Sequence, residues 1–206
     1  MCSWGAADTS GLSYRPNVLA DIPRGGLILL RGPRRVGKSV ELKRMVQRLL
    51  AAATRPRTIV HAAVDGWRAS DLHDLVQVGK RLVPAGTEHR YWLIDEVSSV
   101  RGWADAVINL RDNDTEFAGD TVVLTGSSAG DLTATRKSLA GRRGPTAKPD
   151  RTLLPMGFRA FAAVMMSARG ATAPAAGPLE PADLRTPAAR QAMDDLLPWI
   201  GDLTTW

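Results

Sequence analysis

Residues 26–39 read GLILLRGPRRVGKS, an apolar run followed by a loop with glycines at positions 32 and 37. The run from Leu27 to Leu30 is short and entirely apolar, which is typical of a buried strand. The loop follows the pattern G-x-x-x-x-G-K-[ST], in which two glycines let the backbone curl until successive N–H groups surround a polyphosphate. The strand and the loop together predict a phosphate-binding turn.

A helix is predicted directly after this loop and extends to about residue 53, because apolar residues recur there at helical spacing. Its N-terminus would place the positive end of the helix dipole beneath the phosphates. We expect the Lys38 ammonium to bind the outer phosphates and the Ser39 hydroxyl to ligate Mg²⁺. The predicted nucleotide-binding residues are Gly32, Pro33, Arg34, Arg35, Val36, Gly37, Lys38, Ser39 and Val40. For Arg34 and Arg35 the sequence leaves open whether the side chains reach the phosphates or face solvent.

Charge and composition exclude several classes of protein. The net charge of +6 is compatible with nucleic-acid binding but equally with an arginine-rich surface away from any site. The single cysteine, Cys2, cannot form a disulfide within the chain, and no Cys/His cluster suggests zinc. No stretch approaches the roughly 18 apolar residues of a membrane span, and the start of the chain has no signal-peptide pattern. We expect a cytoplasmic protein without a membrane partner.

Predicted strands and helices alternate along the chain. The strands are expected at 27–30, 58–64, 91–96, 121–124 and 152–156, and the further helices at 69–83, 103–111 and 158–166. This alternation predicts an α/β fold with a mostly parallel sheet covered by helices on both faces. Ligands of such sheets bind at the carboxyl ends of the strands.

The composition also predicts how the chain is divided. Residues 1–24 form a polar N-terminal lead, residues 25–167 form the core domain, and residues 168–206 form a linker rich in proline and alanine with a short helix at 187–197.

Two acids follow the apolar strand at 91–94. The Asp95 carboxylate would reach the Mg²⁺ ion held by Ser39. Glu96 would face the same cleft, where a second acid can orient or deprotonate an attacking water. This arrangement favours hydrolysis of a nucleotide over phosphate transfer to a bound acceptor, although an exposed acidic pair at a strand end remains the simpler alternative.

Five segments occur in an order that resembles a known family. They are GPRRVGKS, YWLIDEVSSVRGW, VVLTGSSA, LAGRRG and LLPMGFRAF, all between residues 15 and 163. Together they resemble the AAA+ class of P-loop ATPases, in particular a prokaryotic branch often fused to a C-terminal domain of unknown function. The resemblance implies a three-layer P-loop NTPase core with a mostly parallel five-stranded sheet. The helical lid usual in that class is absent or minimal here, because no segment matches it.

The resemblance also implies roles for polar residues after the fourth strand. Ser127, or its neighbours Thr125 and Ser128, would be the sensor group that contacts the γ-phosphate and the attacking water. A serine-rich turn that caps a helix is the alternative. Arg142 and Arg143 match the glycine–arginine landmark and would stabilise transition-state charge, in cis or across a subunit interface. Alternatively they belong to a solvated basic loop.

The leading prediction is therefore Mg²⁺-dependent binding and hydrolysis of ATP, with slow turnover. The catalytic residues would be Lys38, Glu96, Ser127, Arg142 and Arg143, and the metal ligands Ser39 and Asp95. Two alternatives stay open, namely an ATP-dependent switch with negligible turnover and a small-molecule kinase. The sequence also leaves open whether the protein binds DNA, a partner protein or further copies of itself.

Overall fold

The computed structural model describes residues 15–83, 89–127, 139–168 and 186–194. The chain forms two compact units, one of residues 16–155 and one that comprises residues 1–15 and 156–206. Several sequence predictions lie outside the described residues, including Cys2, Ser128, most of the N-terminal lead and most of the linker.

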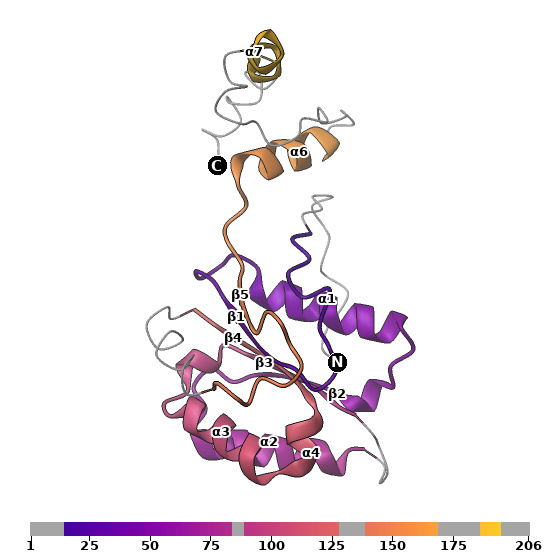
Figure 1. Ribbon diagram of the computed structural model, residues 1–206, viewed down its shortest axis with the longest axis vertical. Coiled ribbons are helices and arrows are strands. Elements are labelled where there is room, and N and C mark those ends of the chain that lie inside the picture. The colour runs from indigo at the N-terminus through magenta and orange to yellow at the C-terminus, as the bar shows by residue number, and fades with distance from the viewer. Residues whose placement is uncertain (1–14, 84–88, 128–138, 169–185, 195–206) are drawn as a thin grey trace. The chain divides into compact units, whose positions relative to one another are not determined.

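A five-stranded sheet forms the centre of the unit of residues 16–155 (Figure 1). The strands are β1 (Leu27–Arg31), β2 (Ile59–Ala63), β3 (Tyr91–Asp95), β4 (Thr121–Gly126) and β5 (Asp150–Thr152). Their order is β2-β3-β4-β1-β5, and all four neighbouring pairs are parallel. The predicted α/β fold with a five-stranded, mostly parallel sheet is confirmed, and the sheet is parallel throughout.

Helices cover both faces of this sheet (Figure 1). One face packs against α1 (Lys38–Ala51), and the other against α2 (Ala69–Arg81), α3 (Trp103–Asn113) and α4 (Thr115–Gly119). Alternate residues of β1 enter the two cores, with Ile28 on the α1 side and Leu29 on the α2 side. Because both faces are buried, the central strands β1, β3 and β4 have consecutive apolar residues in their middle rather than an apolar residue at every second position. Two short 3₁₀ helices, η1 (Pro56–Thr58) and η2 (Val97–Ser99), complete this unit.

The fifth strand differs from its predicted position at 152–156. It occupies residues 150–152, and its Arg151 lies opposite Leu30 of the neighbouring strand β1. The Leu153 N–H still donates to the Arg31 carbonyl at 2.7 Å, but Leu154 is 65% exposed. Pro155 has no N–H to donate, so the predicted strand cannot continue.

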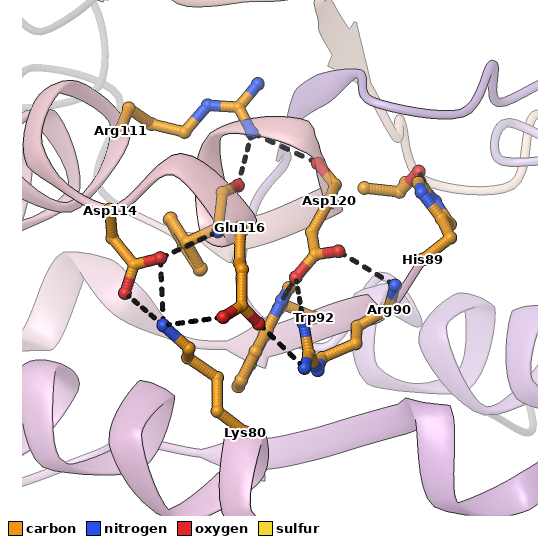
Figure 2. Close-up of polar contacts among 10 residues, drawn as sticks. Lys80, His89, Arg90, Trp92, Arg111, Asp114, Glu116 and Asp120 are labelled. Carbon is orange, nitrogen blue, oxygen red and sulfur yellow. Dashed lines mark hydrogen bonds and ion pairs between the residues drawn. The ribbon is translucent and has the colours of Figure 1, made fainter. Parts of the chain in front are cut away.

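A network of charged residues closes the amino edge of the sheet, where β3 and β4 begin (Figure 2). The Asp120 carboxylate accepts from the Arg90 backbone N–H and from the Trp92 indole, both at 2.8 Å. Lys80 of α2 pairs with Asp114 at 2.9 Å, and its hydrogen bond to Asp114 raises the pKa of Lys80. Buried charges are tolerated here because each has a close partner.

Arg111 of α3 joins the loops at the same edge. Its guanidinium donates to the backbone carbonyls of Phe117 and Asp120, at 2.8 and 3.0 Å (Figure 2). It also donates to the carbonyls of Gly25 and Arg142, at 3.0 and 3.2 Å. Burial lowers the pKa of Arg111, and the charge of Asp120 opposes this change. A single buried side chain thus ties the end of α4 to the segments that precede β1 and β5.

The other unit contains α6 (Phe158–Ala168) and α7 (Pro187–Asp194). The helix predicted at 187–197 corresponds to α7, and residues 195–197 of the prediction lie outside the described residues. Among the described residues, no helix combines the length and the apolar character needed to cross a bilayer.

Gly79 of α2 offers a test of the packing between α2 and the sheet. A Cβ added to Gly79 would lie 2.6 Å from the ring of Trp92, which is fully buried. We expect Gly79→Ala to lower the free energy of unfolding by about 1–3 kcal/mol through overpacking, even though alanine favours a helix by about 1 kcal/mol. Urea unfolding measures this change.

Gly119, the last residue of α4, is the matched control. A Cβ there would meet no atom within 4 Å. We expect Gly119→Ala to leave the stability unchanged or to raise it by less than about 1 kcal/mol. Equal effects of the two substitutions would contradict the packing argument.

Candidate functional site

The carboxyl ends of β1, β3 and β4 meet at one edge of the sheet. In the parallel register Arg31 of β1 lies opposite Gly126 of β4, and Ile94 of β3 lies opposite Leu124. The residues that directly follow these strands are therefore neighbours. The structure in this way brings the phosphate loop, Glu96 and Ser127 together, as the sequence predicts.

The loop between β1 and α1 has the backbone of an anion-binding turn. Arg35 and Gly37 have left-handed φ values of 64° and 99°. Alternation of left- and right-handed residues turns successive N–H groups toward one side and creates a concavity that binds anions. Gly32 is required for a different reason, because a Cβ there would lie only 2.3 Å from the Leu153 carbonyl oxygen.

Lys38 is the first residue of α1, and its ammonium is held at the mouth of the loop. It donates to the carbonyls of Gly32 at 2.9 Å and Pro33 at 2.8 Å. It makes a third hydrogen bond, of 3.1 Å, to the hydroxyl of Ser127, which directly follows β4. These contacts place the positive charge of Lys38 beside the residue predicted as the sensor.

Glu96 follows β3 in a left-handed conformation with a φ of 60°. Its backbone N–H donates to the Thr125 hydroxyl at 2.9 Å. Its carboxylate accepts from the Ser127 hydroxyl, which lies 2.7 and 2.9 Å from the two carboxylate oxygens. The Ser127 N–H in turn donates to the Ser98 hydroxyl at 3.1 Å. The Glu96 carboxylate is thus aimed at the end of β4.

A cleft of about 450 Å³ lies above these groups. Its lining residues are Arg34, Arg35, Gly37, Lys38, Ser39, Val40, Asp65, Glu96 and Ser127. Eight of these nine are residues that the sequence predicted for the site. Asp65 is the exception. It comes two residues after β2, so the rule that sites gather at the carboxyl ends of parallel strands could have found it.

Asp95 lies apart from the lining of this cleft. It is buried, and its carboxylate accepts a 2.5 Å hydrogen bond from Thr125. Serine and carboxylate oxygens are ligands that Mg²⁺ accepts, so Ser39 and Asp95 are chemically suited to the predicted metal site. Among the described residues, no three histidine, cysteine or acidic side chains gather as a metal cluster. The role of Ser39 and Asp95 as metal ligands stays a prediction.

One histidine borders this region. Burial lowers the pKa of His61 in β2, the Asp95 carboxylate opposes this change, and the Lys43 ammonium adds to it. His61 is therefore neutral at neutral pH, and it contributes no positive charge near the acids.

Arg142 and Arg143 lie at the opposite edge of the sheet. The Leu27 N–H, at the start of β1, donates to the Arg143 carbonyl at 2.9 Å. The five residues of β1 separate this point from the phosphate loop, a length of roughly 16 Å. Arg142 pairs with Asp112 at 2.6 Å and Arg143 with Asp150 at 3.1 Å. The structure does not bring either arginine to the cleft of its own chain.

Comparison with known proteins gives two kinds of match. A protein family described as an AAA domain matches residues 24–162. An uncharacterised protein of Haemophilus influenzae is 29% identical over 136 residues, which cover 65% of this chain and 32% of that protein. The chain therefore spans about a third of the length of this relative.

The fold also resembles solved structures. The ORC2 protein of Aeropyrum pernix, in its ADPNP–ADP complexes, matches with a TM-score of 0.50 and 15% identity, over 75% of this chain and 48% of that one. The ADP form of the same protein matches with a TM-score of 0.49 and 16% identity, with the same coverage. The chain spans about half of these structures. At 15% identity, the match to the ADPNP–ADP complexes supports a similar fold and nothing about activity.

Thr125 offers a test of how the two acids are held. Its hydroxyl serves both the Asp95 carboxylate and the Glu96 N–H, and the side chain is fully buried. We expect Thr125→Val to lower the free energy of unfolding by about 1–3 kcal/mol, because the buried Asp95 carboxyl group and the Glu96 N–H both lose their partner. Thr125→Ser keeps the hydroxyl and should lose clearly less. Urea unfolding of both variants measures the difference, and equal losses would show that the hydroxyl is unimportant.

Proposed function

We propose that this chain, which belongs to the AAA domain family of P-loop ATPases, binds ATP together with Mg²⁺ and hydrolyses the bond to the γ-phosphate. One observation carries the proposal. The ammonium of Lys38, the hydroxyl of Ser127 and the carboxylate of Glu96 form a continuous hydrogen-bonded chain at the edge of a cleft that the phosphate loop also lines.

The phosphate loop and Lys38 would bind the phosphates. The left-handed residues Arg35 and Gly37 give the loop the backbone of an anion site, and α1 adds its N-terminal dipole. A bound phosphate oxygen would replace the carbonyls of Gly32 and Pro33 as a partner of the Lys38 ammonium. This exchange favours binding, because a charge-assisted hydrogen bond to an anion is stronger than one to a carbonyl.

Ser39 and Asp95 would hold the magnesium ion, through a hydroxyl and a carboxylate oxygen. When bound, the ion offsets negative charge on the phosphate oxygens. The hydrogen bond from Thr125 fixes the orientation of the Asp95 carboxylate in its buried position.

Glu96 would act as the general base for hydrolysis. Its carboxylate lines the cleft, and the Ser127 hydroxyl holds it in place. As a water oxygen attacks the γ-phosphorus, the bond to the ADP oxygen breaks and Glu96 takes the proton of the water. Ser127 lies between Lys38 and Glu96, so its hydroxyl is suited to contact both the γ-phosphate and this water.

The position of Arg142 and Arg143 limits what they can do. Since they lie beyond the far end of β1, either would act on a phosphate only in a second copy of the chain. Both arginines have an acidic partner, Asp112 for Arg142 and Asp150 for Arg143, but the Arg142 side chain is 34% exposed and that of Arg143 only 10%, so Arg142 is the better placed of the two for this role. The proposal does not include self-assembly, DNA binding or binding of a partner protein.

Two substitutions test the assignment. We expect Glu96→Gln to keep ATP binding and to lower the rate of phosphate release about 100- to 10,000-fold, because glutamine preserves the shape but not the base. We expect Lys38→Ala to weaken nucleotide binding itself. Titration calorimetry with ATP and Mg²⁺ measures the affinity, and a phosphate-release assay measures the rate.

The outcomes separate the alternatives. Unchanged phosphate release in Glu96→Gln, together with lost binding in Lys38→Ala, would show that another group is the base. Stoichiometric retention of ATP without phosphate release by the wild-type chain would favour the switch. ADP formation that requires an added acceptor would favour the kinase. No heat with nucleotide and Mg²⁺ at several temperatures would contradict nucleotide binding altogether.

A further inference from the structure

A second hollow adjoins the phosphate cleft. It has a volume of about 340 Å³, and its lining residues are Arg34, Glu96, Ser98, Ser99 and Ser127. Arg34, Glu96 and Ser127 line both spaces, so the two spaces adjoin at these residues. Of the residues that line the second hollow, Arg34 is the basic one.

The two long cations of this region are in different situations. The Lys38 ammonium is buried and has three hydrogen-bond partners on the protein. The Arg34 side chain is exposed and, within the described part of the chain, forms neither an ion pair nor a hydrogen bond. Its guanidinium is therefore available to a ligand without the loss of an existing contact.

The position of Arg34 decides which part of a nucleotide it can reach. It lies inside the phosphate loop and borders the space that contains the Glu96 carboxylate, where the attacking water would be activated. Negative charge in phosphoryl transfer is spread over the oxygens of the transferred γ-phosphate. A guanidinium binds two such oxygens through its planar fork, and it remains charged at any physiological pH.

We propose that Arg34 is a catalytic residue that binds the γ-phosphate within its own chain. This inference rests on the proposed ATPase function and extends it. It supplies in cis the charge that Arg142 and Arg143 cannot supply to the cleft of their own chain, because they lie at the opposite edge of the sheet.

Arg35 provides a matched comparison. It is the neighbouring arginine of the same loop and is also exposed, but it lines the first cleft and is not among the residues of the second hollow. The two residues therefore carry the same charge, but of the two only Arg34 lines both of the spaces that Glu96 lines. An arginine that contacts only the inner phosphates should bind ADP and ATP equally well, whereas one on the γ-phosphate should distinguish them.

The experiment compares the affinities of ADP and of the non-hydrolysable analogue ADPNP, each with Mg²⁺, by titration calorimetry. We expect Arg34→Ala to lower the affinity for ADPNP at least about tenfold more than the affinity for ADP. Arg35→Ala should change both affinities by the same factor. Arg57→Ala, an exposed arginine of η1, should change neither. Urea unfolding should give the same midpoint for Arg34→Ala and the wild type.

Turnover provides the second measurement. We expect Arg34→Ala to lower kcat about 100-fold or more, and Arg34→Lys to recover part of this loss because the charge returns without the planar fork. An ADPNP-to-ADP affinity ratio in Arg34→Ala that matches the ratio in Arg35→Ala would overturn the inference while leaving nucleotide binding intact. A wild-type chain that binds neither nucleotide would overturn the proposed function and this inference together.

Discussion

The parallel pairing of β4 with both β1 and β3 is the constraint on which the rest of this structure depends. It sets Thr125 beside Asp95 and Glu96, and it sets Ser127 beside Lys38. Side chains alternate between the two faces of a strand, so a slip of one residue would turn Thr125 away from the α1 side and would leave Asp95 buried without its partner. The relative positions of the polar side chains in the site therefore depend on the register of β4.

Buried polar contacts fix both ends of β4, while its middle is apolar. At the amino end, Asp120 binds Arg90 and Trp92, and the guanidinium of Arg111 binds the carbonyl of Asp120. At the carboxyl end, the Thr125 hydroxyl donates to Asp95, the last residue of β3, and the Ser127 hydroxyl donates to Glu96, which follows it. Hydrophobic packing alone specifies which faces are buried but tolerates sliding. Directional hydrogen bonds at the ends specify the position along the strand.

The sequence predicted the parts of this molecule that are governed by local chemistry. The loop before Lys38 and the apolar strands were recognisable because glycine spacing and short apolar runs have direct structural causes. The short helix α4 and the contribution of Asp65 were missed although each has a local signal, namely the N-cap Asp114 and the end of β2. The bounds of β5 and the edge at which Arg142 lies were not recognisable. Each of these depends on contacts between segments distant in the chain, such as the pairing of β5 with β1 or the hold of Arg111 on the Arg142 carbonyl. No periodicity within one segment records such contacts.

The backbone of Glu96 has a consequence for substitutions at this position. A φ of 60° is unfavourable for a glutamate by about 1–3 kcal/mol, whereas glycine adopts it freely and asparagine adopts it readily. Substitution by either residue would relieve the backbone and remove the carboxylate. If Glu96 is the base that we propose, such a substitution would exchange turnover for a more relaxed backbone, while the phosphate loop would stay unchanged.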